Sequence, residues 1–198
     1  MGADGRVSPR HPGGARAAVV FGHPHTEYGG TMHTKVVYQA AKALSRIGCA
    51  VLRFNFRGGG ASEGTFTNGP GERADFRAAL DFMHAEYPNA TMWTAGMSFG
   101  AWIALTVGAE DPRVSTLLGI APPLSRYDFG PVERSTKPKF LIQGEFDEIC
   151  PLKVMREFYA RAAEPKELVV IDAADHLFDG KVHEVADALE DLLEDWSG

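Results

Sequence analysis

The amino-acid sequence predicts an α/β fold: a doubly wound, mostly parallel sheet with helices on both faces. Strand-like and helix-like segments alternate along the chain, which is typical of consecutive strand–helix–strand units. With 198 residues and no internal repeat, the chain suits one domain with one core. Residues 1–15, rich in glycine, proline and arginine, are expected to form a flexible N-terminal segment, and residues 16–198 the domain.

Short apolar runs predict six strands, and longer amphipathic or apolar runs predict five helices. The strands are expected near 16–22, 50–56, 90–95, 115–121, 139–143 and 167–172, and the helices near 31–47, 71–86, 98–109, 151–162 and 181–196. The run at 139–143 is apolar enough for a buried strand. In the last helix the apolar residues from Val182 to Trp196 share one stripe, so this helix is expected to cover the sheet.

A serine is expected at the tip of a strand-to-helix turn within Gly96-Met97-Ser98-Phe99-Gly100. Such a turn strains the backbone of its central residue, and flanking glycines avoid collisions with neighbouring backbone. The hydroxyl group then lies at a helix N-terminus, where N–H groups favour negative charge, as in a nucleophile elbow. The pattern recurs around Ser62, but the turn-forming residues 65–70 follow it, so we interpret Ser62 as a loop residue.

A serine nucleophile needs a base and a carboxylate that fixes the tautomer of that base. Asp147 follows the strand at 139–143, and His176 follows the strand at 167–172. Because parallel strands end at one edge of the sheet, Asp147 and His176 are expected to meet Ser98 there. The alternatives, which we interpret as loop, strand-end or helix-surface residues, are Glu145, Glu148, Asp172 and Asp175 for the acid and His183 for the base.

An acyl-transfer site also needs N–H donors for the oxygen that becomes negative. The N–H group of Phe99 is one candidate, and the loop after the first parallel strand should hold the other. Pro24 in that loop has no N–H group, so His25 or, as an alternative, Thr26 is expected to donate. His23 and His25 also form an H-x-H pair, but the sequence offers no second ligand cluster, and neither metal nor cofactor is expected.

Together these motifs resemble the small, lidless serine hydrolases of the α/β-hydrolase superfamily that are related to dienelactone hydrolases. The resemblance covers nearly everything from Ala17 onward and rests on Gly-His-Pro-His-x-x-Tyr-Gly-Gly at 22–30, the run 52–64, the elbow and the two later loops. It implies a carboxylesterase acting on small acyl esters, with Ser98 as nucleophile, His176 as base, Asp147 as orienting acid and the N–H groups of Phe99 and His25 as oxyanion hole. A dienelactone hydrolase proper has cysteine at the elbow, so lactone specificity is not expected.

The chain departs from this superfamily at its N-terminus. Members usually begin with two antiparallel strands, whereas residues 1–15 contain no alternating apolar run, so both strands are expected to be absent or frayed. Their loss would leave the apolar strand at 50–56 on the sheet edge, where it could pair with another chain. We therefore expect a homodimer, or aggregation, through that edge.

The segment after the strand at 115–121, where larger members insert a lid, is short. Only Pro122 to Pro138 lie there, too few residues for a helical cap, so an open site that takes small acyl groups is expected. The aromatic residues expected to line it, or equally to pack in the core, are Tyr28, Phe99, Tyr127, Phe129 and Phe178.

Composition speaks against two classes of partner and leaves the small-molecule ester that the resemblance implies. A net charge of −6 without a basic stripe speaks against nucleic acid. Without an apolar run of transmembrane length or a signal-peptide core, we expect a cytoplasmic protein with no membrane partner and reduced Cys49 and Cys150. A thioesterase or small peptidase with the same triad, and a non-catalytic interaction protein on this fold, are the alternatives to a carboxylesterase.

Overall fold

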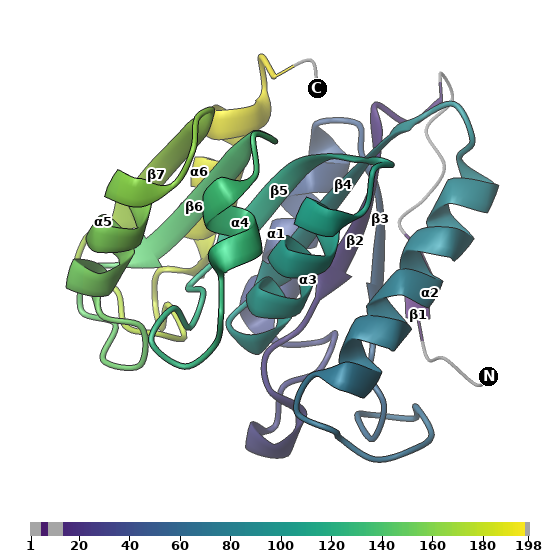
Figure 1. Ribbon diagram of the computed structural model, residues 1–198, viewed down its shortest axis with the longest axis horizontal. Helices are drawn as coiled ribbons and strands as arrows, with labels where there is room; N and C mark the ends of the chain where they lie inside the picture. Colours follow the sequence, from purple (N-terminus) through teal and green to yellow (C-terminus); the bar gives the residue numbers. More distant parts are fainter. Residues whose placement is uncertain (1–4, 8–13, 197–198) are drawn as a thin grey trace.

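The computed structural model describes residues 5–7 and 14–196, which form a seven-stranded sheet with helices on both faces (Figure 1). The strands are β1 (Gly5–Val7), β2 (Ala17–Gly22), β3 (Ala50–Phe54), β4 (Thr91–Met97), β5 (Val114–Ile120), β6 (Lys139–Gly144) and β7 (Lys166–Ile171). The helices are η1 (Thr26–Tyr28), α1 (Lys35–Arg46), α2 (Pro70–Glu86), α3 (Phe99–Glu110), α4 (Gly130–Arg134), α5 (Leu152–Arg161) and α6 (Val182–Leu193). The predicted α/β class and the alternation of its elements are confirmed.

The strand order across the sheet is β1-β3-β2-β4-β5-β6-β7, and β2 to β7 all run parallel. The chain moves from β2 outward to β3 and then returns to the other side of β2 with β4. Strand order therefore reverses between β2 and β4, the position where open α/β sheets hold their ligands beyond the carboxyl ends of the strands. The loops that follow β2 and β4 meet at this point.

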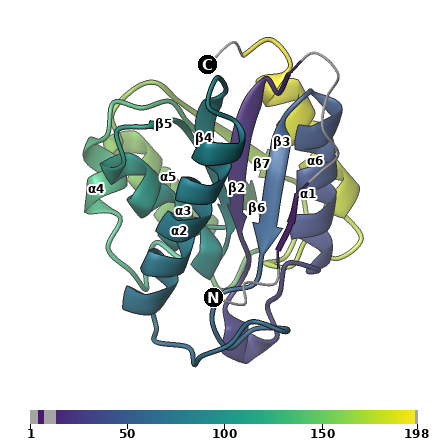
Figure 2. The same cartoon turned by 90° about the vertical axis from the view of Figure 1, so that its right-hand side faces the viewer.

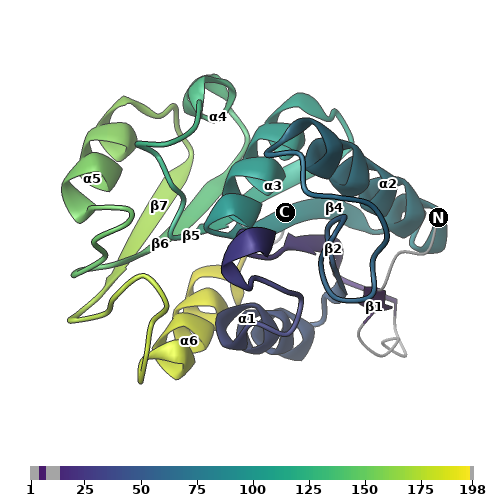
Figure 3. The ribbon, with the colours of Figure 1, turned by 90° about the horizontal axis from the view of Figure 1, so that it is seen from below.

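The sheet divides the apolar interior into two layers, so the predicted single core is split by the sheet. Helices α1 and α6 cover one face, and α2, α3 and α5 cover the other (Figures 2 and 3). Alternation along β2 shows the division: Val19 and Phe21 belong to the layer of α1 and α6, and Ala18 and Val20 to the opposite layer. All six residues of β2 are buried, as a parallel strand covered on both faces requires.

The N-terminal segment contains a strand that the sequence did not predict. β1 pairs antiparallel with β3, with Val7 opposite Leu52 and Gly5 opposite Phe54. All three of its residues are exposed, so no apolar alternation marked them, and pairing with the free edge of β3 defines the strand. The prediction that both early strands are absent or frayed is thus wrong for residues 5–7. The edge of β3 through which we expected a dimer to form is covered by β1 at these residues. The rest of the predicted flexible segment, residues 1–4 and 8–13, lies outside the described residues.

The short connection from β5 to β6 folds into the domain. Its one helix, α4, has five residues and buries Val132. Phe129, just before α4, packs at 6.1 Å between ring centroids from Phe158 of α5. The sequence did not predict this helix because five residues are too few for a helical period. Since the connection packs against α5 and the sheet, it forms no cap over the carboxyl ends of the strands.

Candidate functional site

Ser98 links β4 to α3 in a backbone conformation that residues with a side chain rarely adopt. Its φ is +53° and its ψ −122°, a combination that costs about 1–3 kcal/mol in a residue other than glycine. The Ser98 N–H group donates to the carbonyl of Ile120 at 2.9 Å, and its carbonyl accepts from Ala101 at 2.8 Å. These bonds anchor the turn to β5 and α3, so the surrounding structure maintains the strained conformation predicted for an elbow.

The glycines around Ser98 are required by close backbone contacts. A Cβ atom on Gly96 would lie 2.2 Å from the carbonyl oxygen of Gly100, and one on Gly100 would lie 2.3 Å from the carbonyl oxygen of Gly22. Both distances are shorter than any non-bonded contact between carbon and oxygen. The elbow can therefore approach β2 only without side chains at Gly96 and Gly100.

Replacing Gly96 by alanine is expected to lower the free energy of unfolding by about 3 kcal/mol, because the backbone must shift to relieve the overlap. The matched control is Gly180→Ala, where φ is +73° but nothing lies within 4 Å of the added Cβ. There the loss should be only about 1 kcal/mol. Urea unfolding of the two variants measures the difference, and equal losses would show that the elbow tolerates a methyl group.

A chain of hydrogen bonds joins the three residues predicted to form a triad. Ser98 Oγ lies 2.9 Å from His176 Nε2, and His176 Nδ1 lies 2.8 Å from Asp147 Oδ2. Asp147 is 3% exposed, and Ser98 and His176 are each 9% exposed. The Asp147 carboxylate can only accept, so Nδ1 carries the imidazole proton, and Nε2 is left to accept the serine proton.

The Asp147 carboxylate receives three further hydrogen bonds. Oδ1 accepts from the N–H groups of Ile149 and Cys150 at 2.9 and 2.7 Å, and Oδ2 accepts from Gln143 Nε2 at 2.9 Å. The Gln143 amide nitrogen also donates to the Cys150 carbonyl at 2.6 Å, and both of these partners are acceptors only, which fixes the orientation of the amide. The carboxylate is thus held in one orientation toward His176.

Sequence reasoning missed Gln143, which is fully buried in β6. Among the described residues its Oε1 atom has no hydrogen-bond partner, which costs about 1–3 kcal/mol. A buried acceptor left unpaired at this position indicates that the amide is retained for its bond to Asp147. A polar residue at the end of an apolar strand, four positions before a candidate acid, was the available signal.

The alternative acids and the alternative base have other environments. Asp175 Oδ1 accepts from the backbone N–H groups of Leu177 and Asp179, and Glu145 Oε2 accepts from that of Ala173. All of the alternatives have exposed side chains: Glu145, Glu148, Asp172, Asp175 and His183. The structure therefore brings Ser98 and His176 together with Asp147.

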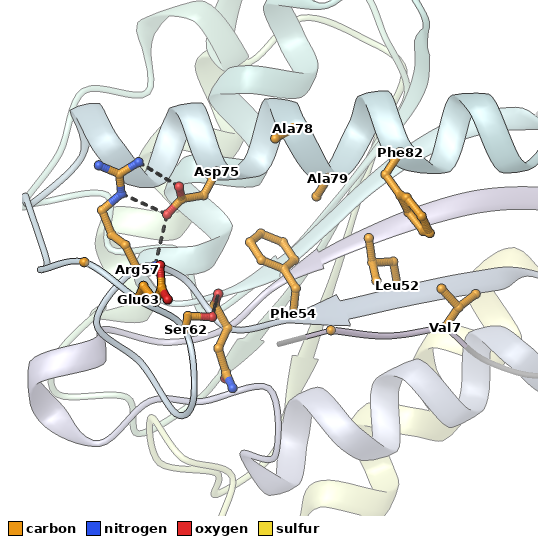
Figure 4. Close-up of a pocket in the computed structure, with 13 residues that line it drawn as sticks. Val7, Leu52, Phe54, Arg57, Ser62, Glu63, Asp75, Ala78, Ala79 and Phe82 are labelled. Carbon is orange, nitrogen blue, oxygen red and sulfur yellow. Dashed lines mark hydrogen bonds and ion pairs between the residues drawn. The ribbon is translucent and has the colours of Figure 1, made fainter. Parts of the chain in front are cut away.

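Ser62 lies in a loop, as predicted, at the border of an apolar groove between β3 and α2 (Figure 4). Its hydroxyl group donates to the carbonyl oxygen of Asn55 at 2.8 Å. The groove has a volume of about 650 Å³, and the ion pair between Arg57 and Asp75 lies at the same end as Ser62, with a closest distance of 2.7 Å. Phe82 lines the opposite end. No strand-to-helix elbow surrounds Ser62.

His23 ties the loop after β2 to the end of β3. Its Nδ1 atom lies 2.6 Å from the Pro24 carbonyl, and its Nε2 atom accepts from the N–H group of Phe56 at 3.0 Å. The imidazole is therefore neutral, with its proton on Nδ1. Burial lowers the pKa of His23 to about 4, although the bond to Pro24 acts in the opposite direction. With both ring nitrogens bonded to backbone, His23 fits a role in fixing this loop.

The burial of neutral His23 predicts a loss of stability in acid. Its folded pKa of about 4 lies below the unfolded value of about 6.5, so the unfolded chain binds the proton more tightly. The stabilising contribution is complete above about pH 6.5 and falls by up to about 3 kcal/mol as the pH drops to about 4. Urea unfolding over this range should give a shallower dependence for His23→Gln than for the wild type, and parallel curves would contradict the assignment.

The structure brings the two residues predicted to donate N–H groups, Phe99 and His25, close to each other. Phe99 is the first residue of α3, so its N–H group has no acceptor within the helix. His25 comes just before η1, and its carbonyl accepts from Tyr28 at 3.2 Å and from Gly30 at 3.0 Å, which folds the loop back on itself. The ring centroids of His25 and Phe99 are 5.3 Å apart. The loop after β2 and the start of α3 therefore face the same region.

A pocket of about 550 Å³ opens at this region. It is lined by His25, Glu27, Tyr28, Phe66, Thr67, Asn68, Arg126 and Tyr127. Tyr28, which is 80% exposed, and Tyr127 are lining residues, so substrate contact stays a prediction for both. The polar lining residues come from loops, where sequence spacing gave no signal.

The same prediction is wrong for Phe129 and Phe178. Phe129 is 5% exposed and belongs to the apolar layer beneath α5, and Phe178 is fully buried in the layer of α1 and α6. Neither ring has surface to offer a substrate. For these two residues the alternative prediction, packing in the core, is the correct one.

Two further features bear on membrane insertion and metal binding. In the part of the chain that the structure describes, no helix is long and apolar enough to cross a membrane. Within the same residues, the one group of three or more side chains placed to hold a metal ion is Asp147, Cys150 and His176, whose ligand atoms lie within 4.8 Å of one another. Asp147 and His176 are already bonded to each other, and burial raises the pKa of the Cys150 thiol, which disfavours the thiolate that a metal would bind.

Comparison with known proteins agrees with this fold. Residues 13–131 match the family described as "Serine aminopeptidase, S33". An uncharacterised protein of Rickettsia prowazekii is 38% identical over an alignment of 206 positions that covers 97% of this chain and 86% of that protein.

Two solved structures share the fold at similar identity. A serine hydrolase homologue from Coxiella burnetii is 34% identical with a TM-score of 0.90, covering 96% of this chain and 90% of that one. A serine hydrolase without a lid from Xanthomonas campestris is 35% identical with a TM-score of 0.90, covering 98% and 89%. The chain therefore belongs to the serine aminopeptidase S33 family of α/β-hydrolases and shares the architecture of members that lack a lid.

Proposed function

We propose that the protein is a serine carboxylesterase that hydrolyses small, short-acyl esters. The observation that carries this proposal is the hydrogen-bond chain from Ser98 through His176 to Asp147, with distances of 2.9 and 2.8 Å. Membership of the hydrolase family supports the same class of chemistry. The strained elbow adds to this support, because it presents the serine hydroxyl group at the N-terminus of α3.

In the first half of the proposed reaction, His176 Nε2 takes the proton of Ser98 while Oγ attacks the ester carbonyl carbon. The carbonyl oxygen becomes negative and accepts hydrogen bonds from the N–H groups of Phe99 and His25. Asp147 stabilises the imidazolium through its bond to Nδ1. When the carbon–oxygen bond breaks, the imidazolium gives its proton to the departing alcohol, and the acyl group remains on Ser98.

In the second half, water replaces the alcohol. His176 Nε2 takes a proton from that water, whose oxygen attacks the acyl carbon, and the same N–H donors hold the second oxyanion. The imidazolium then returns its proton to Ser98 Oγ as the acid leaves. Each residue recovers its initial protonation state, so no cofactor is consumed.

The preference for short acyl groups follows from what surrounds the site. The connection between β5 and β6 packs into the domain and supplies no cap. The pocket beside the elbow is lined by loop residues such as Thr67, Asn68 and Arg126, which offer little apolar surface to a long hydrocarbon chain. A longer acyl chain would therefore add few apolar contacts beyond those that a short ester already makes.

Hydrolysis of p-nitrophenyl esters from acetate to palmitate tests this proposal. We expect kcat/KM to be highest for acetate and butyrate and to fall steeply for longer chains. A fluorophosphonate probe should label Ser98, with the labelled peptide identified by mass spectrometry. An enzyme that hydrolyses none of these esters and resists the probe would contradict the proposal.

A peptidase is the second candidate, because the family that matches residues 13–131 carries the description of an aminopeptidase. The same triad can cleave amides when the site binds the peptide and protonates the departing amine. Aminoacyl p-nitroanilides, acyl thioesters and oxyesters of matched acyl groups separate the three activities. The carboxylesterase proposal predicts the highest kcat/KM for the oxyester.

A further inference from the structure

The pocket lies next to the residue that follows the candidate nucleophile. Phe99 directly follows Ser98, is 1% exposed and packs against side chains of the pocket wall. Its ring centroid lies 5.3 Å from that of His25, 5.2 Å from that of Phe66 and 5.8 Å from that of Tyr127. These three residues also line the pocket. A group bound there is therefore close to any ester carbonyl that Ser98 attacks.

Arg126 is the one arginine or lysine that lines this pocket. Its side chain is exposed, and it forms no ion pair or side-chain hydrogen bond with any residue that the structure describes. Only its backbone N–H group is bonded, to the carbonyl of Pro123 at 3.0 Å. The guanidinium group thus has five N–H donors and a full charge without a described protein partner.

The charge of Arg126 acts on groups from three sides of the site. Burial is the largest influence on the pKa of His25, Tyr127 and Cys150, and Arg126 is a further influence that lowers the pKa of each. His25 belongs to the proposed oxyanion loop, and the Cys150 N–H group donates to Asp147. Arg126 therefore influences both the proposed oxyanion loop and the loop that holds Asp147.

The neighbouring polar groups in the pocket suit an anion bound at Arg126. Tyr127 donates its hydroxyl proton to Asn68 Oδ1 at 3.1 Å, which leaves the Asn68 NH₂ group as a donor. Glu27 is the single acid that lines the pocket, and it makes no ion pair with Arg126. A ligand carrying one negative charge satisfies Arg126, whereas further negative charge would be repelled by Glu27.

We propose that this pocket selects esters that carry a carboxylate remote from the bond being cleaved, and that Arg126 binds this carboxylate. The planar guanidinium matches a carboxylate with two parallel hydrogen bonds, and their direction orients the substrate on Ser98. The inference rests on the proposed esterase function and names its substrate class. It adds selection by charge to the expected preference for small acyl groups.

Turnover of charge-matched esters tests the selection. Monomethyl glutarate places the carboxylate on the acyl side, and acetoxyacetate places it on the alcohol side. Each is compared with an apolar isostere that has an isopropyl group in place of the carboxylate, and with a trimethylammonium analogue. We expect kcat/KM to favour at least one of the anionic esters over its isostere by about tenfold at low ionic strength, with the preference shrinking in salt.

Variants assign the selection to Arg126. In Arg126→Gln the preference for the anionic ester should fall about tenfold, and Arg126→Lys should retain part of it because the charge remains. The matched control is Arg156→Gln, which removes the same charge from the exposed surface of α5, outside the pocket, and should keep the preference. Glu27→Gln should increase the preference, because a competing carboxylate is removed.

A binding measurement separates this inference from the proposed function. Titration calorimetry of monomethyl glutarate, which carries one negative charge, into Ser98→Ala, with and without Arg126→Gln, requires no turnover, and affinity should fall at least about fivefold without the guanidinium group. If no ester is hydrolysed but binding of monomethyl glutarate depends on Arg126, the esterase proposal fails and the anion site stands. Equal turnover of charged and apolar esters, a preference for the trimethylammonium analogue, or binding of monomethyl glutarate that is unchanged by Arg126→Gln would overturn the inference.

Discussion

Replacing Ser98 by alanine is expected to reduce kcat for short esters by about 10⁵-fold, to the level left by the oxyanion donors and substrate binding alone. The substitution removes the only oxygen that His176 Nε2 contacts in the hydrogen-bond chain, so no covalent acyl intermediate can form. KM should change little, because binding does not require the hydroxyl group. Single-turnover and steady-state assays with p-nitrophenyl butyrate measure both quantities.

The matched control for this variant is Ser62→Ala, which lies in the second Gly-x-Ser-x-Gly pattern and removes a hydroxyl group bonded to the backbone at Asn55. Ser62→Ala should retain activity within about twofold of the wild type, since the bond concerns only the loop. Urea unfolding of both variants establishes that each is folded. Loss of turnover in Ser62→Ala with retention in Ser98→Ala would reverse the assignment of the nucleophile.

Replacing Asp147 by asparagine is expected to lower kcat by about 10⁴-fold while leaving the fold intact. The backbone N–H groups of Ile149 and Cys150 hold an oxygen at the Oδ1 position, so the asparagine amide group turns toward His176. An N–H donor facing Nδ1 requires that nitrogen to accept, which moves the imidazole proton to Nε2. The base then presents a proton to Ser98 where it should accept one.

Asp175→Asn is the control for this prediction, because it makes the same change of charge and shape in the residue next to His176. Asp175 caps two backbone N–H groups through Oδ1, a role that asparagine also fills. Its activity should stay within about threefold of the wild type, since no hydrogen bond to the imidazole is altered. A comparable loss in Asp175→Asn would show that local charge, and not the tautomer of His176, controls the rate.

Most of the fold could be predicted because its elements are long enough to show either a period or a continuous apolar run. The run from Lys139 to Gly144 is buried along its whole length, and apolar content alone identified it. β1 and α4 could not be predicted, because three and five residues carry no measurable periodicity. Their formation depends on partners far away in sequence, the edge of β3 and the side chains of α5.

The candidate triad was predictable for a topological reason. Parallel strands place their carboxyl ends together, so polar residues just after β6 and β7 had to lie near the elbow after β4. The pocket was not predictable in the same way, since Thr67, Asn68 and Arg126 come from irregular loops whose paths the sequence does not reveal. The aromatic residues Phe129 and Phe178 show the converse error, because an aromatic ring near a strand end fills the core as readily as it lines a site.

The hydrogen bond between Ser98 and His176 joins residues 78 positions apart, and the strands that carry the candidate triad, β4, β6 and β7, are joined in the sheet through β5. Contacts of such long sequence separation form slowly, because the entropy of closing the intervening chain is lost before the contact stabilises it. Helices α1 to α3 can form from local interactions while the order of the strands is still incomplete. We therefore expect catalytic competence to arise late in folding, so that recovery of activity would report the docking of the last strands, which the recovery of helical structure does not.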